Sequence, residues 1–135
     1  MGTAARNSVD PGLLDVFGVT MFSTKDYREI KGVKGTDEPC LSGYERSFDT
    51  LDIVIGYGRD RTIRMITIRN PQNSIFGIHP GELFAHALQK VHGAGFIEDG
   101  SLNRFRKGDL ALTLRPDESG KLVSLTLEET DSAKK

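Results

Sequence analysis

Arginine side chains crowd two short stretches and are the most localised chemical feature of this chain. One stretch spans a predicted hairpin turn and the other precedes a second predicted hairpin. If both lie on one sheet face, they form a basic stripe that could hold RNA or an acidic protein. The alternative, favoured because the chain as a whole is not basic, is that the charges only keep strand edges soluble. The candidate binding surface consists of Tyr57, Arg59, Arg61, Arg64, Arg104 and Arg106.

The three histidines, His79, His86 and His92, raise the question of a metal site. Glu82 and His86 are four residues apart on a predicted helix, a spacing that can bring two ligands together. The same spacing is typical of an ordinary exposed pair on a helix surface. We therefore predict that the chain binds no metal. If it did bind one, Glu82 and His86 would be the candidate ligands.

No residue pattern indicates an enzyme. Cys40 follows Asp37 and Glu38, and neighbouring carboxylates disfavour the thiolate that a nucleophile needs. The Gly93-Ala94-Gly95 sequence ends a predicted helix, whereas a phosphate-binding loop would open one. No catalytic residue and no cofactor are predicted.

Composition places few constraints on function. The chain has 135 residues, a formal net charge of −1 at pH 7 and a single cysteine. The charge gives no global field to attract nucleic acid or anionic lipid, and one cysteine excludes an internal disulfide framework. The sequence contains neither a signal peptide nor an apolar window of membrane-spanning length. We expect a cytoplasmic protein that does not enter a membrane.

Two stretches with strand periodicity have similar patterns of apolar residues, and each position in the second lies 59 residues after its counterpart in the first (110 − 51 = 59). Residues 51–70 and 110–129 both alternate apolar and polar positions around a turn, as a half-buried β-hairpin does. Phe17-Gly18-Val19 and Phe76-Gly77-Ile78 stand at the same offset. The alternative is that two unrelated hairpins share a common pattern.

Two helices are predicted from capping signals. Ser23 can cap a short helix that Gly32 ends, with Asp26 where a capping-box acid belongs. Pro80 suits the start of a second helix, which Gly93 ends.

The predicted fold class is α+β. Each of two pseudo-repeated halves would contain a short helix, a strand and a β-hairpin, and the halves would share a mostly antiparallel sheet with the helices on one face. Residues 1–11 would be a flexible N-terminus, residues 12–127 a single domain with half-repeats 17–70 and 76–127, and residues 128–135 a charged tail.

The segment Gly77-Ile78-His79-Pro80-Gly81-Glu82, a helix ending at Gly93 and strands ending in Gly120-Lys121-Leu122-Val123 resemble a small bacterial module. This pattern is similar to the helix-and-strand units of the BamE-like outer-membrane lipoproteins and of the β-lactamase-inhibitor-protein fold. The resemblance implies two units fused in tandem, with a concave sheet that grips a partner protein. The chain lacks the signal peptide, lipid-accepting cysteine and paired cysteines of those families, so no functional residue is carried over.

The expected function is that of a small binding protein without enzymatic activity, which recognises a partner protein through its sheet face as inhibitors and immunity proteins do. One alternative is a small-molecule binder or enzyme with a pocket between helix and sheet that uses Glu82, His86 or Tyr57. Another is RNA binding on the arginine stripe, which the overall charge disfavours. Both a monomer and a homodimer joined through a hairpin edge remain open.

Overall fold

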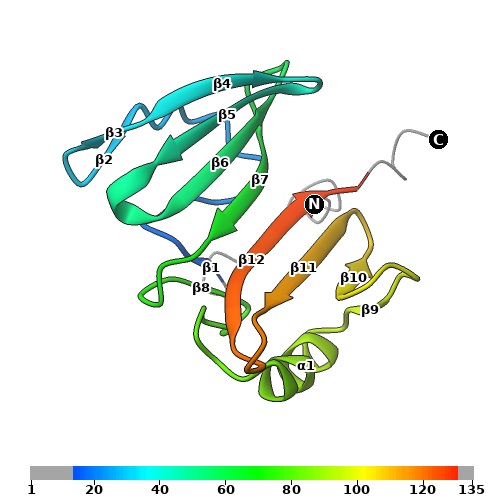
Figure 1. Ribbon diagram of the computed structural model, residues 1–135. Helices are drawn as coiled ribbons and strands as arrows, with labels where there is room; N and C mark the ends of the chain where they lie inside the picture. Colours follow the sequence, from blue (N-terminus) through cyan, green and yellow to red (C-terminus); the bar gives the residue numbers. More distant parts are fainter. Residues whose placement is uncertain (1–13, 131–135) are drawn as a thin grey trace.

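One long antiparallel sheet organises the chain (Figure 1). A computed structural model describes residues 14–130. The sheet has eight strands in the order β4-β5-β6-β7-β12-β11-β10-β9. Their bounds are β4 Thr36–Cys40, β5 Gly43–Phe48, β6 Ile53–Gly58, β7 Ile63–Ile68, β9 Ile97–Glu98, β10 Arg104–Lys107, β11 Leu110–Pro116 and β12 Leu122–Glu129.

Smaller elements flank this sheet. β1 (Leu14–Asp15) pairs with β8 (Ser74–Ile75), and β2 (Glu29–Ile30) pairs with β3 (Val33–Lys34). A 3-10 turn, η3 (Asp49–Leu51), precedes β6. The only α-helix within residues 14–130 is α1 (Phe84–Gly93).

β7 and β12 join the two hairpins at the centre of the sheet. Thr67 lies directly opposite Thr126, and their hydroxyl oxygens are 2.9 Å apart. On the other face of the same two strands, Ile66 faces Leu127 and Ile68 faces Leu125. All four of these aliphatic side chains are fully buried. The central strand pair thus has one apolar and one polar face, as the alternation of side chains along a strand requires.

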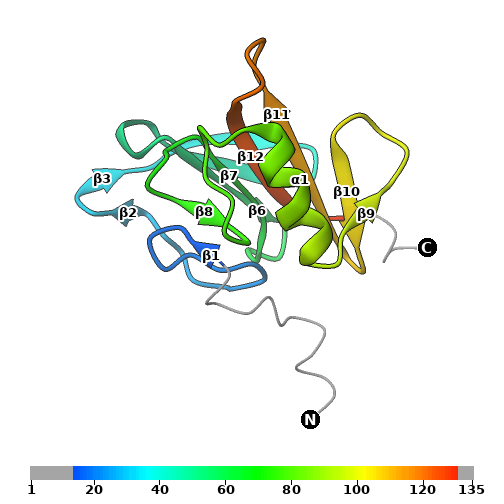
Figure 2. The same cartoon turned by 90° about the horizontal axis from the view of Figure 1, so that it is seen from below.

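The apolar face of the sheet is covered. Helix α1 lies against the β11–β12 half, and the β1–β8 ribbon lies against the β6–β7 half (Figure 2). Ala87 and Val91 of α1 belong to the same buried cluster as Ile55, Ile66 and Leu112 of the sheet. We call this covered side the inner face and the opposite side the outer face.

The predicted α+β class is wrong, because the structure is mostly β with a single α-helix in the part described. The mostly antiparallel character of the sheet is confirmed. The two halves are not copies of one helix-containing unit: α1 belongs to the second half, and no α-helix forms between Ser23 and Ile30. The sheet therefore does not carry a helix from each half.

Long-range contacts explain why residues 22–28 do not form a helix. The N–H of Phe22 donates to the carbonyl of Ile63 (2.7 Å), and the N–H of Ile63 donates to the carbonyl of Ser23 (2.8 Å). The Asp26 carboxylate accepts hydrogen bonds from Arg46 and Arg28 instead of capping a helix. The segment therefore runs along the end of β7, where its backbone groups find partners outside any helix.

The predictions for the two chain ends can be compared with the structure only within residues 14–130. The predicted flexible segment 1–11 lies outside the described residues, as do residues 131–135 of the predicted tail. Strand β12 extends to Glu129, so the first two residues of that tail belong to the sheet. Within residues 14–130, no helix is long and apolar enough to cross a membrane.

Candidate functional site

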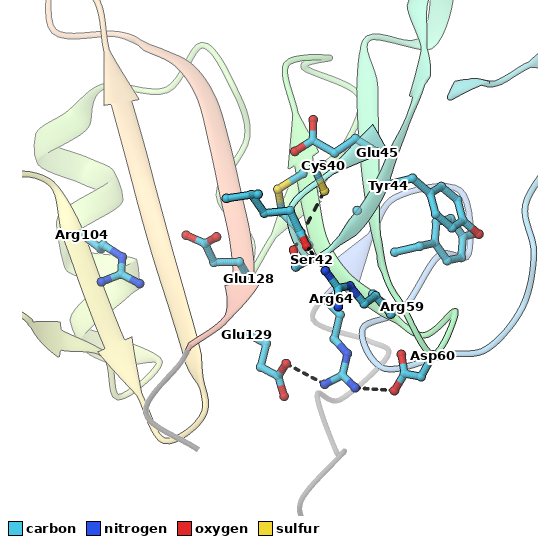
Figure 3. A pocket seen from close by; sticks show the side chains of 15 residues that line it. Cys40, Ser42, Tyr44, Glu45, Arg59, Asp60, Arg64, Arg104, Glu128 and Glu129 are labelled. Carbon is cyan, nitrogen blue, oxygen red and sulfur yellow. Dashed lines mark hydrogen bonds and ion pairs between the residues drawn. The ribbon is translucent and has the colours of Figure 1, made fainter. Parts of the chain in front are cut away.

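A groove of about 980 Å³ opens on the outer face, between β5–β7 on one side and β10–β12 on the other (Figure 3). Its lining comes from segments far apart in the sequence. Cys40 at the end of β4, Leu41 of the following turn, Glu45 of β5 and Glu128 of β12 all contribute. The complete lining is Cys40, Leu41, Ser42, Tyr44, Glu45, Gly56, Tyr57, Gly58, Arg59, Asp60, Arg64, Met65, Arg104, Glu128 and Glu129.

A β-bulge in β7 places Arg64 at one end of this groove. Gly56 of β6 faces Met65, but the next residue, Tyr57, faces Ile63, so Arg64 has no partner on β6. An extra residue of this kind bends a strand and redirects its side chain. The Arg64 side chain therefore lies between Asp60 of the β6–β7 turn and Glu129 of β12.

The Arg64 guanidinium forms ion pairs with two carboxylates. Nη1 donates to Glu129 Oε1 and Nη2 donates to Asp60 Oδ2, both at 2.6 Å. Hydrogen bonds from the Thr62 hydroxyl and N–H, together with Arg64, lower the pKa of Asp60 to about 2. Asp60 is therefore ionised at neutral pH, and the Arg64 charge is neutralised within the protein.

A transverse row of side chains crosses the floor of the groove. Directly opposite residues on neighbouring strands share a face, and the strand registers place Glu45 opposite Gly56, Gly56 opposite Met65, and Met65 opposite Glu128. Glu38 of β4 extends the row next to Glu45. The floor between the two groove carboxylates thus consists of a glycine and a flexible methionine.

The carboxylates of Glu38, Glu45 and Glu128 form no hydrogen bond or ion pair with any residue in the described part of the chain. Glu38 and Glu45 face each other across β4 and β5. Like charges directly opposite on a sheet repel each other and destabilise the pair. This row therefore carries negative charge that no residue between 14 and 130 neutralises.

The structure brings three of the predicted arginines to the groove, namely Arg59, Arg64 and Arg104. Arg59 Nη2 donates to the carbonyl of Leu41 (3.0 Å), and Arg104 Nη1 donates to Asp99 Oδ2 (2.6 Å). Because carboxylates neutralise Arg64 and Arg104, a continuous basic stripe does not form.

Two further predicted arginines, Arg61 and Arg106, do not line the groove. Arg61 lies in the β6–β7 turn with a φ angle of 67° and an exposed side chain. Arg106 is on β10, opposite Ala111 of β11.

Tyr57, the aromatic member of the predicted surface, is structural. It is only 2% exposed, and its ring stacks on Tyr44 with the ring centroids 5.0 Å apart. Its hydroxyl donates to the carbonyl of Lys25 and accepts from the N–H of Tyr27, both at 2.9 Å. Burial raises the pKa of this hydroxyl, which keeps its proton available for donation. Tyr57 therefore attaches residues 25–27 to the sheet through its hydroxyl.

Replacing Tyr57 with phenylalanine is expected to lower the free energy of unfolding by about 1–2 kcal/mol, because the Tyr27 N–H and the Lys25 carbonyl lose a partner. Chemical denaturation measures the change. Tyr44→Phe is the matched control, since no hydrogen bond of the Tyr44 hydroxyl lies within the described structure; its expected change is within about 0.5 kcal/mol. Equal losses in the two variants would contradict this role of Tyr57.

The structure does not place Glu82 and His86 on one helical face, because α1 begins only at Phe84. Glu82 Oε2 accepts from the N–H of His79 (3.0 Å) and from Lys90 Nζ (2.8 Å). His86 is exposed on the helix. Between Leu14 and Thr130, no three His, Cys, Asp or Glu side chains form a group that could hold a metal ion.

Sequence reasoning missed the two groove carboxylates. Glu45 lies in a strand whose partner register could not be assigned, and Glu128 was placed in the predicted tail. The alternation of β12 was the available signal: continued past Leu127, it puts Glu128 on the same face as Thr126.

Comparisons of the chain with protein-family models, with curated proteins and with solved structures found no match. They therefore give no support to the resemblance to the BamE-like and inhibitor-protein modules. The geometry of the groove is the basis for the functional argument that follows.

Proposed function

We propose that this chain is a binding protein that recognises a partner protein through the groove on the outer face of its sheet. The observation that carries the proposal is the convergence, within residues 14–130, of a groove on the outer face and carboxylates that have no ion-pair partner. Groups that lower stability without serving the core are often retained for binding.

The sheet edges support binding through the face. β4 contains Pro39, which has no N–H to offer a new strand, and acidic Asp37 and Glu38 stand beside it. β9 at the opposite edge has only two residues. Both features discourage the addition of a strand, so we do not propose a homodimer joined through these edges.

The charges favour a protein over nucleic acid. Two of the three groove arginines are neutralised by carboxylates, while Glu45 and Glu128 have no ion-pair partner in the part of the chain that the structure describes. Phosphate groups would be repelled by this row, and the release of counterions that drives nucleic-acid binding needs free cationic side chains.

The rim of the groove offers a direct test. Cys40 is the only cysteine of the chain, is exposed and lines the groove. A photoreactive maleimide on Cys40 should cross-link a partner in an extract of the producing cells. The same label on a Cys40→Ser, Glu118→Cys variant should not, because Glu118 is an exposed turn residue outside the groove.

A cross-link alone would not establish the role of the groove, so the purified partner must also be titrated. We expect one-to-one binding that weakens at least about tenfold, or about 1.4 kcal/mol, in a Glu45→Lys, Glu128→Lys variant. Glu118→Lys changes the charge outside the groove and should leave the affinity unchanged. Absence of a cross-linked partner, or equal affinity of all three proteins, would refute the proposal.

A further inference from the structure

We propose that the occupant of the groove is an extended basic segment of the partner, whose cationic side chains pair with Glu45 and Glu128. This inference rests on the proposed function and specifies the chemistry of the partner. It is carried by the positions of the two carboxylates, the floor between them and the charges on the walls (Figure 3).

The floor between the carboxylates is suited to an extended backbone. Gly56 has no side chain to obstruct a strand lying across the sheet, and Met65 beside it adapts its shape to different neighbours. A Cβ atom added to Gly56 would lie 2.9 Å from the Met65 Cβ, so a larger residue could not stand here without a shift of β7. The floor is therefore low between two raised acidic sides.

The separation of the carboxylates sets a spacing for the ligand. Glu45 on β5 and Glu128 on β12 are three strands apart in the sheet. Measured along the sheet, three inter-strand steps of about 4.8 Å separate their Cα atoms by about 14 Å, which is an upper limit on the direct distance across the groove. In an extended peptide, side chains four residues apart project from the same side and are separated by about 13 Å. A segment with two cationic residues at this spacing can reach both carboxylates at once.

The charges of the walls are complementary to such a segment. Arg64 is held by Asp60 and Glu129, so its charge is neutralised at the end of the groove. Arg59 donates to the carbonyl of Leu41 and keeps its charge at that end of the lining. Among the described residues, the carboxylates of Glu38, Glu45 and Glu128 have no ion-pair partner and outnumber this one cation, which favours a cationic ligand. A basic segment would also relieve the repulsion between Glu38 and Glu45.

A peptide titration tests this inference with the intact chain. The probe is a blocked peptide of glycine and serine with two lysines four residues apart, and the matched peptide has the same composition with its lysines adjacent. At low salt, we expect the first peptide to shift the backbone amide NMR signals of Glu45, Gly56 and Glu128. We expect the adjacent-lysine peptide to bind several-fold more weakly, because it can reach only one carboxylate at a time.

Substitutions that remove charge provide the second arm. In a Glu45→Gln, Glu128→Gln variant, the affinity for the first peptide should fall on the order of tenfold, whereas Glu118→Gln should leave it unchanged. Equal binding of the two peptides, undiminished binding by the double variant, or no signal shifts at millimolar peptide would overturn the inference. If the Cys40 label identifies a partner that the charge-reversed groove releases, but the peptide does not bind, the proposed function stands and this inference fails.

Discussion

Replacing Arg46 with methionine is expected to lower the free energy of unfolding by about 3 kcal/mol at pH 7. Arg46 is 4% exposed and lies on the inner face of β5. Its Nε and Nη2 donate to the two carboxylate oxygens of Asp37 (2.6 and 2.9 Å), and Nη1 donates to Asp26. Methionine fills much of the volume but leaves both carboxylates without their cation. Chemical denaturation measures the loss.

Arg46 matters because it connects three parts of the chain. Besides its two ion pairs, it donates to the carbonyl of Tyr27 (3.2 Å) and lies over the rings of Tyr44 and Tyr57. These contacts tie residues 26–27 and the edge strand β4 to the body of the sheet. We expect both to lose protection from hydrogen exchange in the Arg46→Met variant.

The effect of this substitution should depend on pH. The hydrogen bonds from Arg46 lower the pKa of Asp26 and of Asp37. A carboxyl whose pKa is lowered by folding stabilises the protein above its unfolded pKa of about 3.9, and this stability is lost as pH falls through the folded pKa. The difference between the wild type and Arg46→Met should therefore be largest at neutral pH and shrink as the pH falls through the lowered pKa values of the two carboxyls.

The half-exposed partners limit the size of the effect. Asp26 and Asp37 have side chains 42% and 49% exposed, so water compensates part of the lost interaction. Arg115→Met is the control, since Arg115 is exposed on β11, and we expect it to change stability by less than about 0.5 kcal/mol. Similar effects of the two substitutions, or a loss that does not change with pH, would show that Arg46 is not the anchor described.

The strands of the sheet centre could be predicted from the sequence because their contacts are with near neighbours. In β6, the spacing of Ile53, Ile55 and Tyr57 indicates a strand with one buried face. Strand β7 follows after a short turn. The bulge at Arg64 interrupts the alternation of apolar and polar residues along β7. Hairpin pairing is local, so its pattern is retained in the sequence.

Residues 22–28 could not be predicted, because distant residues determine their structure. Ser23 and Asp26 are good capping residues, but Ile63 and Arg46 provide the partners that their segment uses. β4 contains Pro39, a residue that argues against a central strand but that an edge strand tolerates. In residues 22–28, tertiary contacts overrode local propensity.

The groove depends on strand order, which the sequence does not specify. Glu45 and Glu128 are on one floor only because β7 pairs with β12. The inner position of Arg46 did have a signal, since Tyr44, Arg46 and Phe48 alternate along β5 and share one face. An arginine between two aromatic residues on a buried face predicts an ion pair but does not identify its partners.

Replacing Gly43 with alanine is expected to lower the free energy of unfolding by about 3 kcal/mol, through overpacking and an unfavourable backbone angle. Gly43 has a φ angle of 155°, and a Cβ atom there would lie 2.0 Å from the carbonyl oxygen of Tyr57. The obstructing atom belongs to the backbone of β6, so no rotation of a side chain can relieve the clash. The β4–β5 turn must move, and with it the groove residues Cys40 and Leu41. Chemical denaturation measures the stability, and the reaction rate of Cys40 with a maleimide reports the turn.

Two other glycines separate the clash from the general cost of replacing glycine. Gly108, in the β10–β11 turn, has a φ angle of 58° but no atom within 4 Å of an added Cβ, so Gly108→Ala should cost only about 1 kcal/mol. Gly93, the last residue of α1, is also open to an added Cβ, and Gly93→Ala should stabilise the protein by about 0.5–1 kcal/mol. If Gly43→Ala behaves like Gly108→Ala, β5 does not approach β6 as closely as described.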